Sequence, residues 1–148
     1  MELAASVSRS VDLPISLDEA WASIGEAKGL AGWLGDSLEL EVVAPGVAGL
    51  LRDGDAVRRL VVTEVDAGRS IGFVWWDEAS PQEASVVTIA LTPGEGGTTV
   101  TVTERLAGAA HASIGFASID DLVGAADAAW DQRLQALVGA CALADACV

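Results

Sequence analysis

The feature that most constrains this chain is a run of short alternating segments between residues 38 and 104. Apolar side chains recur at every second position, as in Ile71, Phe73 and Trp75, which is typical of a β-strand with one buried face. The links are short and carry turn formers such as Asp53-Gly54, so successive strands must run antiparallel. The predicted strands cover residues 38–43, 47–52 and 56–65, followed by segments around 71–75, 87–91 and 100–104.

One more strand and two short helices precede these segments. Residues 6–13 alternate, which places four side chains on one face: Val7, Arg9, Val11 and Leu13. Ser16 and Glu19 fit a capping box, in which each side chain bonds the backbone of the other, so a helix is predicted to begin there. A second short helix is predicted over residues 27–34.

One long apolar stripe follows the strands. From Ile119 to Cys141, apolar residues recur at helical spacing, which predicts a helix over about residues 118–144. A helix with one apolar face must pack on a partner, and the one-sided sheet is the only large surface that the predicted elements offer. The sequence therefore predicts a single α+β domain over residues 1–148, with a long C-terminal helix across a seven-stranded antiparallel sheet.

The charge balance excludes several classes of partner. The 148 residues include 22 Asp and Glu against 8 Lys and Arg, a formal net charge of −14. Such a surface repels nucleic acid and acidic lipid headgroups, and it disfavours anionic ligands. The longest apolar stretch, residues 136–144, is too short to cross a bilayer, and the N-terminus has no secretory pattern. We expect a cytoplasmic protein with no nucleic-acid partner and no membrane.

Templates for catalysis and metal binding are absent from the sequence. The chain has one His and two Cys, too few ligands for a structural zinc site, and no phosphate loop or nucleophile elbow. We therefore expect no metal and no cofactor, and we assign no catalytic residue. His111 is interpreted as a solvated loop side chain, with a general base as the alternative.

Several strings resemble one protein family in order and spacing. They are Arg9-Ser-Val-Asp-Leu-Pro14, Glu19-Ala-Trp21, Leu30-Ala-Gly-Trp33, Val62-Thr-Glu-Val-Asp66 before Ile71-Gly-Phe73-Val-Trp75, Gly97-Thr98 opening Val100-Thr-Val102-Thr-Glu104, and Trp130 with Leu134 and Leu137. Over nearly the whole chain they resemble the activator of Hsp90 ATPase homologue (AHSA1-like) branch of the SRPBCC, or START/Bet v 1-like, superfamily. The resemblance implies a helix-grip fold, in which a curved sheet wraps around the C-terminal helix, with a cavity for apolar ligands between them.

Glu104 is the most informative polar residue. It shares parity with Val102 and should point toward the cavity, where a carboxylate is costly unless it is paired. Arg9 shares the inner parity of the first strand, which lies beside the last strand in the helix-grip fold. We therefore weigh an inner Arg9–Glu104 ion pair against two solvated charges at the rim of the sheet.

The tryptophans suggest either core packing or a ligand cradle. Trp75 is the best candidate for touching a ligand, whereas Trp76 has the opposite parity and should face outward. The candidate ligand-binding residues are Arg9, Trp33, Phe73, Trp75, Ile89, Val102, Glu104, Phe116, Leu122 and Trp130.

The only positive cluster consists of Arg52, Arg58 and Arg59. These arginines could attract an anionic group, but the simpler interpretation is that they pair with the neighbouring carboxylates of Asp53, Asp55 and Glu64.

Three functions are compatible with the sequence. The preferred one is a binding module for a small apolar or amphipathic molecule. The second is a chaperone co-regulator or interaction module that acts on a protein partner or as a homodimer. The third is a cyclase/aromatase-like or hydrolase-like enzyme that uses Glu104, His111 or Arg9 in the cavity.

Overall fold

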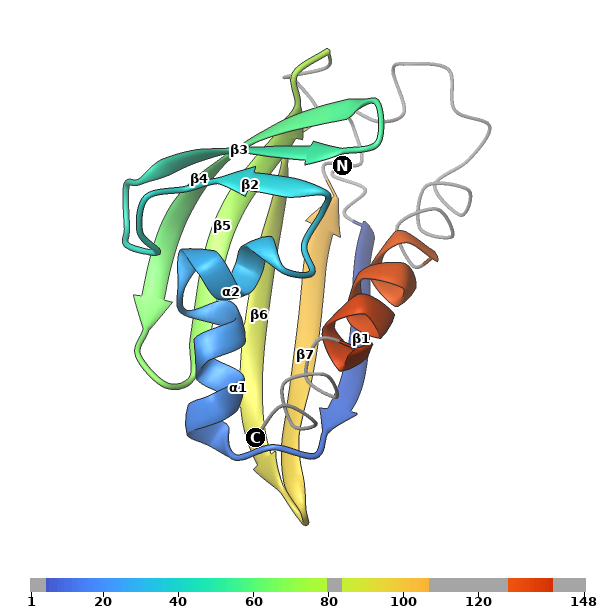
Figure 1. Cartoon of the computed structure of the whole chain (residues 1–148). Coiled ribbons are helices and arrows are strands. Elements are labelled where there is room, and N and C mark those ends of the chain that lie inside the picture. The colour runs from blue at the N-terminus through green and yellow to red at the C-terminus, as the bar shows by residue number, and fades with distance from the viewer. Residues whose placement is uncertain (1–4, 80–83, 107–127, 140–148) are drawn as a thin grey trace.

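The computed structural model describes residues 5–79, 84–106 and 128–139 (Figure 1). Strand β1 (Ala5–Leu13) is followed by helices α1 (Leu17–Ile24) and α2 (Ala27–Ala31). The remaining strands are β2 (Ser37–Glu39), β3 (Ala48–Asp53), β4 (Ala56–Asp66), β5 (Ser70–Asp77), β6 (Ser85–Gly94) and β7 (Gly97–Leu106). The C-terminal helix is described over residues 128–139, and the rest of the predicted 118–144 helix lies outside the described residues.

All seven strands form one antiparallel sheet in the order β1-β7-β6-β5-β4-β3-β2. Because β1 pairs with β7, the N-terminal strand lies beside the last strand of the meander. The predicted α+β helix-grip fold is confirmed by this sheet, by the two short helices after β1 and by the helix at residues 128–139. Among the described residues, no helix is both long and apolar enough to cross a membrane.

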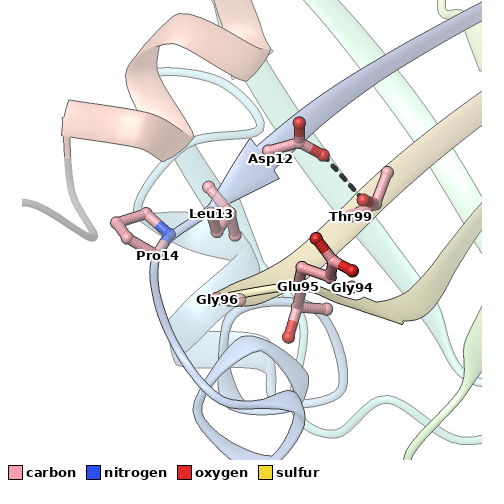
Figure 2. A pocket seen from close by; sticks show the side chains of 9 residues that line it. Asp12, Leu13, Pro14, Gly94, Glu95, Gly96 and Thr99 are labelled. Atoms are coloured by element: carbon pink, nitrogen blue, oxygen red, sulfur yellow. Dashed lines mark hydrogen bonds between the residues drawn. The ribbon is translucent and has the colours of Figure 1, made fainter.

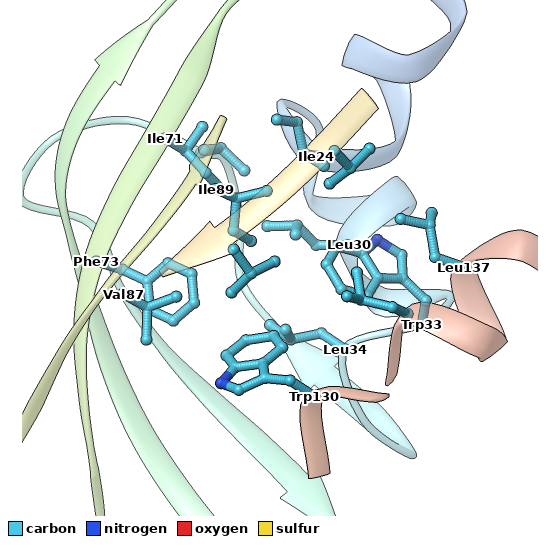
Figure 3. Packing of buried hydrophobic residues seen from close by; sticks show 14 of the residues in the cluster. Ile24, Leu30, Trp33, Leu34, Ile71, Phe73, Val87, Ile89, Trp130 and Leu137 are labelled. Atoms are coloured by element: carbon cyan, nitrogen blue, oxygen red, sulfur yellow. The ribbon is translucent and has the colours of Figure 1, made fainter. Parts of the chain in front are cut away.

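The inner face of the sheet forms the core. On β5, Ile71, Phe73 and Trp75 are each 1% exposed, and Val87 and Ile89 on β6 are fully buried. Helix α1 packs over β6 and β7, and Figure 3 shows residues of α1, of the α2 region and of the C-terminal helix meeting this face. The alternating pattern of the sequence therefore reports the buried face correctly.

The sheet curves where β4 contains a bulge. The register with β5 shifts between Val62 and Glu64, which adds one residue to β4. An extra residue of this kind bends its strand and increases the local twist. The helices lie on the concave side of the sheet (Figure 1).

Local signals at the N-terminal helices agree with the sequence in part. Ser16 and Glu19 form the predicted capping box at α1. Helix α2 ends at Ala31 rather than at residue 34, because the chain turns at Gly32 and buries Trp33 and Leu34 in the core.

Strand β2 is also shorter than the predicted 38–43. It pairs with β3 only over Ser37–Glu39 and then leaves the ladder. The backbone of Gly46 and Val47 takes up hydrogen bonds with Val62 instead. Further along this segment, Val43 is 7% exposed and packs in the core, so an edge strand that continued straight would lose this burial.

Candidate functional site

Two tryptophans and one carboxylate form the polar centre of the interior. The indole Nε1 of Trp75 on β5 donates to Glu104 Oε2 on β7, and Nε1 of Trp130 on the C-terminal helix donates to Glu104 Oε1, both at 2.8 Å. Trp75 and Trp130 are at most 1% exposed, and Glu104 is 5% exposed. Each carboxylate oxygen thus accepts one buried N–H, which offsets part of the cost of removing the charge from water.

Arg133 lies against this centre. Its Nε donates to the carbonyl oxygen of Leu34 and its Nη2 to Asp53, each at 3.0 Å, although the residue is only 8% exposed. The guanidinium carbon lies 5.0 Å from the Trp75 ring centroid and 4.9 Å from that of Trp130. Both distances are within the range of cation–π attraction.

Burial lowers the pKa of Arg133 below its ordinary value, and the nearby positive charge of Arg58 lowers it further. Asp53 and Glu104 act in the opposite direction and offset part of this effect. Arg58 lies on β4, and its guanidinium carbon is 4.6 Å from the Trp75 ring centroid. Two guanidinium groups therefore share the surroundings of one indole.

A pocket of about 200 Å³ lies where the C-terminal helix meets the segment after α2. Its walls are formed by Gly32, Trp33, Leu34, Gly35, Asp36, Asp53, Ala129, Gln132, Arg133 and Ala136. Arg133 thus contributes to the pocket wall and also contacts the two core indoles. Arg133 is therefore shared by the pocket wall and the polar centre.

A larger hollow of about 390 Å³ lies at the β6–β7 turn (Figure 2). It is lined by the end of β1 and the turn glycines, with Asp12 accepting a 2.6 Å hydrogen bond from Thr99. No described aromatic ring, arginine or buried carboxylate reaches it. The larger hollow therefore offers few groups that could recognise a ligand. We take the smaller pocket as the candidate site.

The structure brings six of the predicted residues together on the inner face. Phe73, Trp75, Ile89, Val102, Glu104 and Trp130 are all buried there. Phe73 meets Trp75 edge to face and Trp130 stacks on Trp75, with 5.4 Å between centroids in both pairs. In this part of the core, the sheet and the C-terminal helix contact each other through aromatic rings.

The remaining predicted residues divide into three cases. Trp33 lines the pocket, and its Nε1 donates to the carbonyl oxygen of Ser23 at 2.9 Å. Arg9 lies at the β1 edge with a partly exposed side chain. Phe116 and Leu122, as well as His111, lie outside the described residues.

The Arg9–Glu104 ion pair is not formed. The two residues do share a face, because Val7 lies opposite Glu104 and Arg9 opposite Val102 in the β1–β7 register. However, the Arg9 guanidinium is 2.6 Å from Asp131 on the C-terminal helix, while Glu104 accepts from the indoles. The helix that covers the face supplies partners that strand parity alone does not show.

Sequence reasoning missed Arg133 as a site residue. It lies three residues after Trp130 and four before Leu137, within the apolar stripe of the helix. The sequence did contain a signal for this role, a charged residue on an otherwise apolar helix face. A buried guanidinium needs hydrogen-bond or ion-pair partners. Among the described residues, no group of three or more His, Cys, Asp or Glu side chains could hold a metal ion.

A family model described as polyketide cyclase / dehydrase and lipid transport (Polyketide_cyc2) matches residues 4–142. The chain belongs to this family. The family is part of the SRPBCC superfamily, in agreement with the helix-grip topology. No curated protein matches the chain.

Solved structures of this fold are similar over most of the chain. DynU16, a protein in the dynemicin biosynthetic locus, is 22% identical with a TM-score of 0.74, covering 90% of this chain and 45% of its own. CalU16 from Micromonospora echinospora is 15% identical with a TM-score of 0.65, covering 93% and 83%. The Aha1 dimer from Colwellia psychrerythraea is 14% identical with a TM-score of 0.69, covering 92% and 95%. This member of the cyclase and lipid-transport family therefore spans less than half the length of DynU16.

Proposed function

We propose that this domain binds a small apolar or amphipathic molecule between the sheet and the C-terminal helix, entering through the pocket beside Trp33. The observation that carries the proposal is the position of Arg133, which lines the pocket and also rests on the core indoles of Trp75 and Trp130. Small-molecule sites typically combine apolar walls with a few polar groups that fix orientation. In this pocket the apolar side chains are Trp33, Leu34, Ala129 and Ala136, and the polar ones are Asp36, Asp53, Gln132 and Arg133.

The pocket volume limits what enters first. About 200 Å³ is below the roughly 300–1,000 Å³ of typical ligand pockets, so it accommodates a small molecule such as two fused rings with a short polar tail. A larger ligand requires the C-terminal helix to move away from Trp33 and Leu34. The bonds that resist this movement are those of Arg133 to Leu34 and Asp53.

The family description favours binding over any one reaction. Cyclisation or dehydration of a polyketide and transport of a lipid both begin with the uptake of a largely apolar molecule. Glu104 is the buried carboxylate among the described residues, and both of its oxygens already accept indole N–H groups. A general acid or base needs to reach its substrate, so this arrangement favours binding over catalysis by Glu104.

We propose that the chain belongs to the AHSA1-like branch, supported by the strings around Trp33 and Trp75 and by the likeness in fold to the Aha1 dimer. A chaperone or dimer function on this basis predicts a stable complex in pull-down or a dimer mass in solution. We also propose that the chain forms one domain, since the family match spans residues 4–142. We further propose a cytoplasmic location.

The test is a titration with naphthylethanol, an apolar ring with a neutral polar end, followed by tryptophan fluorescence. Ala129 lines the pocket and Ala128 is exposed on the same helix, so Ala129→Leu and Ala128→Leu form a matched pair. We expect saturable binding to the wild type and to Ala128→Leu, with binding about tenfold or more weaker in Ala129→Leu. Equal binding by both variants, or no saturable binding to the wild type, would overturn the proposal.

A further inference from the structure

Arg58 is a positive charge held on the inner face of the sheet. It shares parity with the buried Leu60 on β4, and its guanidinium lies over the Trp75 ring at 4.6 Å. Its neighbour Arg59 has the opposite parity and forms an ion pair with Glu78 at 3.6 Å, with both side chains about half exposed. The two adjacent arginines therefore face opposite sides of the sheet.

Among the described residues, no carboxylate lies within ion-pair distance of Arg58. The nearby acids have other partners. Asp53 pairs with Arg133, Glu104 accepts from the two indoles, and Asp77, opposite Arg58 in the β4–β5 register, accepts from the Ala79 N–H at 2.8 Å. The expectation that Arg58 pairs with Asp53, Asp55 or Glu64 is therefore wrong.

Arg58 also lies close to a second guanidinium. Burial is the main cause of the lowered pKa of Arg133, and the positive charge of Arg58 is the next. Two positive groups on one indole repel each other, and an anion close to Arg58 would relieve that repulsion. A guanidinium offers a planar fork of N–H donors that matches the two oxygens of a carboxylate.

We propose that Arg58 binds the carboxylate of the ligand, so that the molecule taken up is an acid with an otherwise apolar body. This inference rests on the proposed binding function and names its ligand class. The net charge of −14 does not prevent such binding, because surface charges beyond about 8 Å are largely screened at physiological salt. Two arginines lie over Trp75, and Arg58, unlike Arg133, has no carboxylate within ion-pair distance among the described residues.

The test compares two probes that share one apolar body, naphthylacetate with a carboxylate and naphthylethanol with a neutral hydroxyl. Each is titrated against the wild type, Arg58→Met and Arg59→Met. Methionine keeps an unbranched apolar stem and removes the charge. Arg59→Met is the matched control, since it removes the neighbouring charge from the outer face.

We expect the wild type to bind naphthylacetate about tenfold or more tightly than naphthylethanol, because hydrogen bonds to charged groups are stronger than neutral ones. Arg58→Met should lose this preference while binding naphthylethanol as the wild type does, and Arg59→Met should keep it. Naphthylethanol binding without a preference for the acid, or a preference that survives in Arg58→Met, would overturn the Arg58 proposal alone. Failure of both probes to bind the wild type would overturn the binding function and this inference with it.

Discussion

Trp75 and Trp130 stack on each other with ring centroids 5.4 Å apart and planes inclined by 21°, although one belongs to β5 and the other to the C-terminal helix. Both donate their indole N–H to the carboxylate of Glu104 on β7. One buried acid thus joins two strands and the covering helix. We expect the packing of the helix on the sheet to depend on this contact.

Glu104→Gln should destabilise the protein. The amide has one carbonyl oxygen, so one of the two indole N–H groups would face an NH₂ group and lose its acceptor. We expect the free energy of unfolding to fall by about 1–3 kcal/mol, the cost of an unsatisfied buried donor. Urea denaturation with an unchanged m-value measures this, and Glu95→Gln at the exposed β6–β7 turn is the control. An unchanged midpoint for Glu104→Gln would show that the contact contributes nothing.

Asp53→Ala should cost at least as much stability as Arg133→Met. Arg133→Met removes a buried charge together with its desolvation cost, whereas Asp53→Ala leaves the Arg133 guanidinium, 9% exposed, without its carboxylate partner. We expect a loss of about 1–3 kcal/mol for Asp53→Ala in urea denaturation, and no larger loss for Arg133→Met. A negligible loss for Asp53→Ala would contradict this view of Arg133.

The effect of Arg133 should not vary with pH near neutrality. Because burial lowers its pKa, the native state holds this proton less tightly than the unfolded chain does. The resulting penalty is complete at neutral pH and is relieved only as the pH rises through the lowered pKa in alkaline solution. The stability difference between wild type and Arg133→Met should therefore be constant between about pH 6 and pH 9. A clear slope over that range would require another titrating partner.

Asp131→Asn should have a small, salt-dependent effect. The Arg9–Asp131 pair spans 2.6 Å but is largely solvated, with side chains 41% and 55% exposed. We expect a loss of about 0.2–1 kcal/mol at low salt that shrinks at high salt, as for other surface pairs. Thermal unfolding in both buffers measures it, and a loss that persists at high salt would indicate a stronger role at the β1 edge.

Gly97→Ala should loosen the junction between β1 and β7. A Cβ at Gly97 would overlap the carbonyl oxygen of Leu13, whereas at Gly94, directly opposite in the β6–β7 hairpin, its nearest neighbour would lie at 3.7 Å. We expect a loss of about 1–3 kcal/mol for Gly97→Ala and little change for Gly94→Ala, both in urea denaturation. Equal effects would mean that the backbone adjusts freely there.

The sequence predicted the sheet well because alternation reports one local property, which side of a strand is buried. Ile71, Phe73 and Trp75 followed this rule, as did Glu104 despite its charge. The two strand and helix ends that were wrong, after Glu39 and Ala31, depend on where the chain leaves its neighbours to bury Val43, Trp33 and Leu34.

The candidate site was predicted less completely, because its partners come from different elements. Parity placed Arg9 and Glu104 on one face but could not show that the C-terminal helix would bring Asp131 to one and Trp130 to the other. For the same reason Arg58 was grouped with Arg59 by adjacency, although the strand sends the two side chains to opposite faces.

The most direct test of the binding account is to locate a bound probe by NMR, following the five indole N–H signals during a titration with naphthylethanol. Trp33 lines the pocket, whereas Trp76 has the opposite parity to the buried Trp75 on β5. We expect a saturable shift of the Trp33 signal with the Trp76 signal unchanged. A shift confined to Trp76, or no shift of Trp33 at saturating probe, would contradict it.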